Sequence, residues 1–198
     1  MYWQPEDPTD DPEVELKKDP CINGDGTYSP NCPGWHSYSN ADNPNLVCPA
    51  YLHCTEAQMM DYLYRFAFPG QNPNDPVSNG DVNLVWLGIL PLGHIETGVN
   101  GLMITNVTQG DHLMYDGQVV REAIKNSDGS WSIVTTGTGN NVQIPISTYD
   151  SNLSPFEPQF PSSSETAQFT FASLNQLLGL GAFNDLDRAM LNYIVENH

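Results

Sequence analysis

The densest group of residues that could do chemistry lies between positions 93 and 121. His94 and Glu96 stand in a glycine-rich stretch, Asp111 and His112 follow an alternating apolar run, and Arg121 lies in the next such run. A histidine oriented by a carboxylate is a general base, and an arginine stabilises negative charge that develops on an oxygen. We therefore predict His112 as general base, Asp111 or Glu96 as the residue that orients it, and Arg121 as the charge-stabilising group.

Two further side chains belong to this candidate site. Tyr115 lies three residues beyond His112 and would assist it, and His94 is a second histidine beside a carboxylate. The chain has no G-x-S-x-G, P-loop, G-x-G-x-x-G or H-E-x-x-H motif. No serine or cysteine has a convincing triad partner, so we predict no covalent nucleophile, no cofactor and no metal.

Arg121 also has a structural interpretation. The chain contains only three arginines, so an arginine inside a β-rich segment requires an explanation. A buried guanidinium needs a paired anion. The candidate anions are Glu96, Asp111 and Glu122.

The four cysteines lie within a short segment rich in Gly, Pro, Asn and Ser. They are Cys21, Cys32, Cys48 and Cys54, and four cysteines allow three pairings. The most local pairing, Cys21–Cys32 with Cys48–Cys54, is the first choice. A zinc site using His36 or His53 is disfavoured because no C-x-x-C pair is present, and free thiols are the remaining alternative. Disulfides would place the protein outside the reducing cytosol.

The elements that must position these side chains follow from periodicity and turn signals. Thr55 and Gln58 form a capping box ahead of a helical apolar pattern, which Pro69-Gly70 would end. Further helices are predicted over residues 171–180, where Gly179 and Gly181 interrupt the pattern, and over 185–197. The candidate strands span residues 82–87, 102–107, 119–124 and 131–136.

These elements predict an α+β fold with a small antiparallel sheet packed by a few helices. Residues 1–20 are an acidic, proline-rich linker, and residues 21–198 form a single domain whose first part, 21–54, is a disulfide-stapled loop segment. Residues 135–141, which read Thr-Thr-Gly-Thr-Gly-Asn-Asn, are interpreted as a loop after the last strand. Such a loop could line a pocket or hold phosphate, although a flexible hydroxyl-rich loop is the simpler interpretation.

The charge of the chain limits its partners. The 198 residues include 24 acids and only 6 bases, for a net charge of −18. Nucleic acid and anionic membranes are both recognised by clustered Lys and Arg, so neither is expected as a partner. No run of 18 apolar residues indicates a membrane span. The first 18 residues are acidic without an apolar core, so we do not interpret them as a signal peptide.

Short motifs between Ile104 and Gly139 carry a family resemblance. They are Ile-Thr-Asn-Val-Thr at 104–108, His112, Gly-Gln-Val-Val-Arg at 117–121, Gly129, Ile-Val-Thr at 133–135 and Gly-Thr-Gly at 137–139. This pattern resembles C-terminal variable domains of bacterial polymorphic toxins of the Rhs type. The resemblance covers about a fifth of the chain. It implies an exported effector domain made with a neutralising immunity protein, and it implies no particular reaction.

Composition then selects among types of toxin. Nuclease toxins tend to be basic, and disulfides favour a target outside the cytoplasm. The leading hypothesis is a secreted antibacterial effector that hydrolyses an envelope substrate, with peptidoglycan ahead of lipid. It would act in the periplasm or extracellularly.

Two other hypotheses remain open. One is a non-catalytic module that binds carbohydrate or a receptor through exposed aromatics such as Trp3, Trp35 and Tyr38, and the other is a structural domain of a secreted particle. An enzyme should bring His112, Arg121 and a carboxylate into one concave pocket, whereas a binding module should present a flat aromatic patch.

Overall fold

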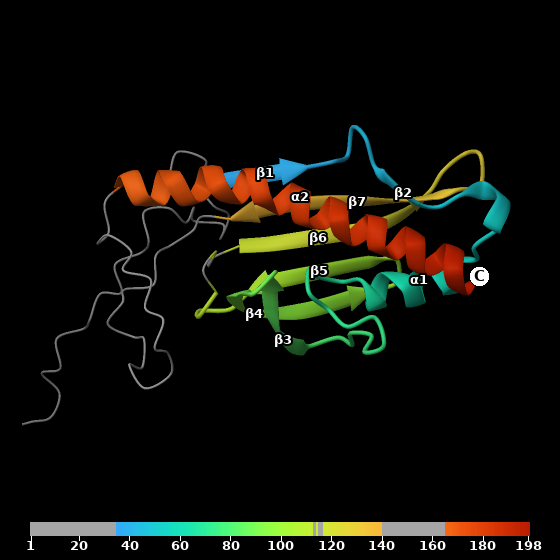
Figure 1. The fold of residues 1–198 in the computed structure, drawn as a ribbon, viewed down its shortest axis with the longest axis horizontal. Coiled ribbons are helices and arrows are strands. Elements are labelled where there is room, and N and C mark those ends of the chain that lie inside the picture. Colours follow the sequence, from blue (N-terminus) through green and yellow to red (C-terminus); the bar gives the residue numbers. More distant parts are fainter. Residues whose placement is uncertain (1–34, 113, 115–116, 140–164) are drawn as a thin grey trace, which may run out of the picture.

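The computed structural model describes residues 35–112, 114, 117–139 and 165–198, which form an α+β fold (Figure 1). A seven-stranded antiparallel sheet and two helices make up most of this described part of the chain. The strands are β1 (His36–Ser39), β2 (Asn45–Cys48), β3 (Asp81–Leu87), β4 (Leu90–Asn100), β5 (Met103–Thr108), β6 (Gly117–Lys125) and β7 (Trp131–Gly139). The helices are α1 (Glu56–Arg65) and α2 (Glu165–Asn197), and a 3-10 turn, η1, spans Ala50–Leu52.

The sheet is a meander from β3 to β7 that the N-terminal strands complete. Its order is β1-β7-β6-β5-β4-β3, and β2 also pairs with β7. β2 pairs with the beginning of β7 and β1 with its end, so both occupy one edge while β3 forms the other. The predicted antiparallel sheet is therefore confirmed, and it is larger than the four strands expected from the sequence.

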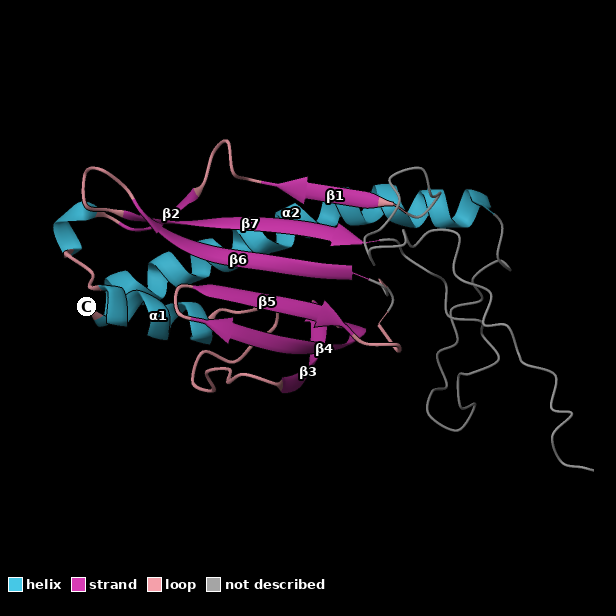
Figure 2. Cartoon of the chain, turned by 180° about the vertical axis from the view of Figure 1, so that it is seen from behind, coloured by secondary structure: helices cyan, strands magenta, loops and turns pink. Residues whose placement is uncertain are grey.

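The two faces of the sheet differ. Both helices lie on one face, as the views from either side show (Figures 1 and 2). Ile104 and Ile133 of that face are fully buried in a core that also contains Met190 and Ile194 of α2. No helix of the described residues covers the opposite face (Figure 2). The fold therefore has two layers, with one open sheet face.

α1 begins as its sequence predicts. The Thr55 hydroxyl accepts a hydrogen bond from the Gln58 backbone N–H, and the Gln58 side chain accepts one from the Thr55 N–H. Met59 and Leu63 of this helix are fully buried. The helix ends at Arg65, one turn before the expected stop at Pro69-Gly70.

The expected pair of C-terminal helices is wrong, because α2 runs without a break from Glu165 to Asn197. Gly179 does not interrupt the helix but lets it approach the sheet. A Cβ on Gly179 would lie 2.8 Å from the Tyr38 ring, whereas one on Gly181 would meet nothing within 4 Å. In this helix, glycine at 179 makes room for an aromatic side chain.

The loop expected at residues 135–141 is a strand as far as Gly139. Gly137 pairs directly with Tyr38 and Gly139 with His36. A Cβ on Gly137 would lie 2.1 Å from the Tyr38 ring, and one on Gly139 would lie 2.8 Å from the His36 ring. The alternating glycines therefore leave space for two rings of the neighbouring strand, which rules out the phosphate-loop interpretation for this part.

Three strands were not predicted. β1 and β2 are four residues each and lie in the cysteine-rich segment, where no alternation was visible. β4 contains His94 and Glu96 and replaces the expected glycine-rich stretch. Glycine and proline within a strand weaken the sequence signal for it, although neighbouring strands can still hold it in the sheet.

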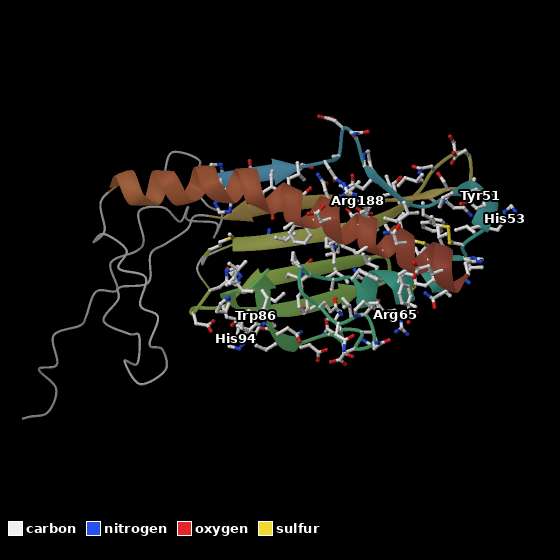
Figure 3. The ribbon with its side chains drawn as sticks, in the orientation of Figure 1. Tyr51, His53, Arg65, Trp86, His94 and Arg188 are labelled. Carbon is white, nitrogen blue, oxygen red and sulfur yellow. A yellow bond between two sulfur atoms is a disulfide. The ribbon has the colours of Figure 1, made fainter. Side chains whose placement is uncertain are left out.

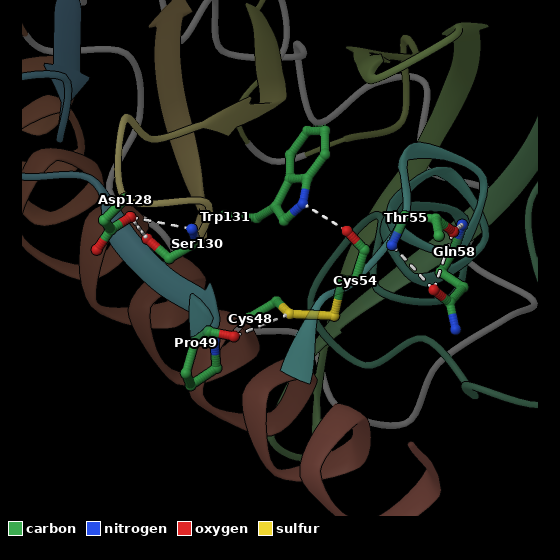
Figure 4. Close-up of a disulfide and its surroundings, with 8 residues drawn as sticks. All are labelled: Cys48, Pro49, Cys54, Thr55, Gln58, Asp128, Ser130 and Trp131. Atoms are coloured by element: carbon green, nitrogen blue, oxygen red, sulfur yellow. Dashed lines mark hydrogen bonds between the residues drawn. A yellow bond between two sulfur atoms is a disulfide. The ribbon is translucent and has the colours of Figure 1, made fainter. Parts of the chain in front are cut away.

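The predicted Cys48–Cys54 disulfide is present (Figure 4). Cys48 ends β2, Cys54 precedes α1, and the Trp131 indole N–H donates to the Cys54 carbonyl at 2.9 Å. The bond therefore ties the start of α1 to the edge of the sheet. Cys21 and Cys32, the linker at 1–20, Trp3 and Tyr115 all lie outside the described residues. Within the described part, no helix is long and apolar enough to cross a membrane.

Candidate functional site

Arg121 is held in a buried ion pair. Its side chain is fully buried on the helix-facing side of β6, and its Nη2 donates to Oδ1 of Asp187 at 2.7 Å. The expectation that its anion is Glu96, Asp111 or Glu122 is therefore wrong. Asp187 lies on α2, whereas Glu122, as the next residue of the strand, points to the opposite face of the sheet.

Further contacts make this pair a junction between α2 and the sheet. The second Asp187 oxygen accepts a hydrogen bond from the Asn45 side chain at 2.7 Å. The Arg121 guanidinium lies 5.2 Å from the centre of the Phe183 ring, a cation–π distance. Asn45, Arg121 and Asp187 thus connect β2, β6 and α2. The role that these contacts support for Arg121 is structural.

His94 and Asp111 form a partly exposed pair on β4 and the segment after β5. Their side chains are 45% and 52% exposed, and His94 Nδ1 lies 2.5 Å from Asp111 Oδ2. The other carboxylate oxygen accepts the His94 backbone N–H at 3.1 Å. Partial burial would raise the pKa of Asp111, but these hydrogen bonds and the His94 charge bring it below its ordinary value. The arrangement fixes the imidazole with Nδ1 on the carboxylate.

Gly93 connects this pair to His112. Gly93 has φ +111°, and a Cβ built on it would lie 2.4 Å from the His112 Cα and 2.6 Å from the Asp111 carbonyl oxygen. The segment that carries Asp111 and His112 therefore packs directly on the backbone of β4. Both histidines consequently lie at the same end of the sheet, where β4 and β6 begin and β5 ends.

His112 is a buried, neutral imidazole. The Met114 backbone N–H donates to its Nδ1 at 3.1 Å, so the ring proton is on Nε2. Burial lowers the pKa of His112 from 6.5 to about 4; the Asp111 charge opposes this shift and the His94 charge adds to it. No hydrogen bond joins Nε2 to any residue that the structure describes. His112 is therefore an N–H donor at neutral pH, and its geometry does not favour the role of general base.

His112 lines a pocket between the sheet and α2. The pocket is partly open to solvent. Its apolar lining residues come from both layers and are Phe68, Pro69, Val85, Leu92, Ile95, Met114, Val119, Ala182 and Phe183. Gly179 and Ala182 leave space beneath α2 that larger side chains would fill. An apolar pocket with a few polar groups is the usual form of a ligand site.

Two polar side chains of the pocket are already hydrogen-bonded within the protein. Asn106 accepts from Thr97 and donates to the Ala67 carbonyl. Thr108 donates to the Gly117 carbonyl and accepts from the Gly117 N–H. The His112 Nε2–H therefore remains as a donor for a ligand.

The predicted cluster is thus assembled in part. The structure places His94, Asp111 and His112 at the same end of the sheet, but of these three and Arg121 only His112 lines the pocket. Glu96 is exposed and lies two residues from His94 along β4, and Tyr115 lies outside the described residues. The single concave site expected for an enzyme, with Arg121 beside His112, is not found among the described residues.

Sequence reasoning missed three residues that shape the site. His36 and Tyr38 line the pocket from β1, and Asp187 holds Arg121. Tyr38, expected as an exposed aromatic, packs between Gly137 and Gly179. The signal for Asp187 was an acid in the apolar stripe of the last helix, between Phe183 and Met190. Of the residues predicted for that stripe, Ala189 is exposed.

No protein-family model and no curated protein matches this chain.

Proposed function

We propose that this chain is a secreted antibacterial effector domain that hydrolyses an acyl ester of the cell envelope. The observations that carry the proposal lie at one end of the sheet: an apolar pocket with an imidazole N–H donor on the helix-covered side, and a carboxylate-oriented histidine that projects from the open face of β4. The pocket would take the acyl chain. The carbonyl group would lie at the end of the sheet, where His112 reaches it from the pocket and His94 from the open face.

His94 and His112 have different roles in this reaction. The His94 Nε2 takes a proton from water, whose oxygen adds to the acyl carbonyl carbon, and Asp111 stabilises the imidazolium. The His112 Nε2–H donates to the carbonyl oxygen as negative charge develops on it, as a neutral imidazole can. When the carbonyl re-forms, the ester C–O bond breaks and His94 returns the proton to the leaving alkoxide. The products are a carboxylic acid and an alcohol.

The pocket lining favours lipid over peptidoglycan. Glycan and peptide substrates carry many hydrogen-bonding groups, whose desolvation in an apolar pocket is costly. An acyl chain gains free energy from the same burial, about 0.8 kcal/mol per methylene. The proposal therefore reverses the order of substrates expected from the sequence.

Secretion and the toxin role rest on separate support. The Cys48–Cys54 disulfide favours an oxidising compartment. The motifs between Ile104 and Gly139 supply the resemblance to Rhs-type effector domains, and with it the expectation of an immunity protein.

Hydrolysis of acyl esters tests the proposal. The oxidised chain is incubated with 4-nitrophenyl octanoate, 4-nitrophenyl acetate and phospholipid vesicles, and product release is measured. We expect octanoate to be preferred over acetate, and His94→Asn and Asp111→Asn to lower kcat by about 100-fold or more, the usual contribution of a general base. His53→Asn is the control, because His53 lies at the opposite end of the molecule from His94 (Figure 3) and asparagine tolerates its φ of 54°.

The outcome also separates the alternatives. Absence of hydrolysis by the wild-type chain, or full activity of His94→Asn, would contradict the proposal. Saturable binding of the octanoyl group without turnover would favour the non-catalytic binding module. Release of peptidoglycan fragments in place of acyl products would restore the order of substrates expected from the sequence.

A further inference from the structure

We infer that the open face of β3, β4 and β5 is a docking surface for a basic amphipathic helix of a partner protein. This outer-face patch consists of Val82, Leu84 and Val107, and it lies on the side of the sheet opposite the helices. Its three side chains are between 37% and 58% exposed, and Trp86, beyond the β-bulge of β3, is 40% exposed. Ile89, at the adjacent β3–β4 turn, is 96% exposed. Exposed apolar side chains that gather on one face, here around the polar residues of β4, mark interaction surfaces.

The strand register makes these side chains neighbours. Val82 pairs with Glu96, and Glu96 pairs with Val107, so these three residues form one row across three strands. Leu84 pairs with His94 in a second row. One carboxylate thus stands between two exposed valines. A partner side chain that is apolar along its length and cationic at its end would fit this row.

The width of the patch matches a helix. Three neighbouring strands span two inter-strand spacings, about 10 Å in all. An α-helix with its side chains is also about 10 Å across. The outward apolar side chains of β6 and β7, which are Val120, Ile124 and Val134, are only half-exposed, whereas those of β3 and β5 are exposed. A single helix over β3 to β5 would therefore cover the most exposed apolar side chains of this face.

The charge around the patch requires a basic partner. Between Arg65 and Arg121 the sequence contains no Lys or Arg, and its acids are Asp75, Asp81, Glu96, Asp111 and Asp116. A helix with an apolar stripe flanked by Lys or Arg would complement both properties of the surface. No described residue covers the patch, and the undescribed segments carry only Lys17 and Lys18 as bases.

The same charge disfavours other occupants. A second copy of this chain would bring a further −18 to the interface. An anionic lipid surface would be repelled by the acids of this segment. Neither occupant supplies the cations that Glu96 lacks among its strand neighbours.

Binding of a synthetic helix tests the inference. The probe is an 18-residue amphipathic peptide with a leucine stripe flanked by lysines, and the control peptide has glutamate in place of lysine. Calorimetry measures both against the full oxidised chain. We expect saturable binding of the lysine peptide only, weakened about tenfold by Leu84→Ser, because the lost burial corresponds to about 1.4 kcal/mol. Val195→Ser is the matched control, since Val195 is 50% exposed on α2.

Three results would overturn the inference. They are equal binding of both peptides, equal affinity of the Leu84→Ser and wild-type chains, and a dimer in sedimentation that Leu84→Ser dissociates. The last result would assign the face to self-association. Binding and hydrolysis by Val82→Ser, measured in parallel, separate failure of this inference from failure of the proposed reaction, because Val82 pairs with Glu96 and not with His94.

Discussion

Arginine and aspartate form a buried pair between β6 and α2 and an exposed pair within α2, with different consequences for stability. Arg121 and Asp187 are 0% and 1% exposed, whereas Arg188 and Asp185 are 72% and 77% exposed. Removing one partner of a buried pair leaves an uncompensated charge, at a cost of about 3–5 kcal/mol. An exposed pair is screened by water and contributes little.

We therefore expect Asp187→Ala to lower the free energy of unfolding by about 3–5 kcal/mol, and Asp185→Ala to leave it nearly unchanged. Urea denaturation of both variants at pH 7 is the measurement. Should Asp187→Ala prove too unstable to isolate, Arg121→Met with Asp187→Leu should restore a folded protein by replacing both charges. Equal effects of Asp187→Ala and Asp185→Ala would contradict the structural role of the pair.

At this scale the sequence identified the chemical groups more reliably than their partners. Arg121 was singled out because arginine is scarce, but its carboxylate lies 66 residues away in the sequence. The sequence singled out both His94 and Asp111, which are 17 residues apart. They meet because the backbone of Asp111 and His112 packs against Gly93, which precedes His94. Such pairings are decided by tertiary packing and leave no local periodicity to detect.

The elements differ in how completely the sequence specifies them. α1 carries its own start signal in the Thr55 and Gln58 side chains, so it could be predicted. β4 contains Gly93 and Gly98, and its extended form depends on pairing with β3 and β5. The sequence of β1 alone does not predict a strand. Its place in the sheet depends on β7, where Gly137 and Gly139 leave space for the rings of Tyr38 and His36.

The two glycines of α2 provide a test of its packing. Alanine in a helix interior is favoured over glycine by about 1 kcal/mol, so Gly181→Ala should stabilise the protein by up to that amount. Gly179→Ala should destabilise it relative to Gly181→Ala, because its Cβ would meet the Tyr38 ring at 2.8 Å. Thermal unfolding of the two variants measures the difference. A higher melting temperature for both, by the same amount, would show that α2 does not press on Tyr38 as described.

The described part of the molecule is a two-layer fold whose faces have separate properties. The helix-covered face holds the core, the Arg121–Asp187 pair and the apolar pocket, and the open face carries the outer-face patch and the His94 side chain. The fold class could be predicted from the order of helical and β-type patterns in the sequence. The pocket could not be predicted, because it results from the position of α2 over the sheet and from the small residues at positions 179 and 182. The net charge of −18 is a property of this scale as well, and it is consistent with the basic partner that we propose.

The account depends most on His112 as a neutral N–H donor within an apolar ligand pocket. Nitrogen-15 NMR of the five histidines tests this directly, with resonances assigned from single variants. Because burial lowers the pKa of His112 to about 4, its ring should remain in the neutral Nε2–H form from pH 7 down to about pH 5 and take up its second proton only around pH 4. Octanamide, which this reaction should not cleave readily, should shift the His112 resonance and leave that of His53 unchanged. Titration of His112 near pH 6.5, or a His112 resonance that octanamide does not shift, would contradict the account.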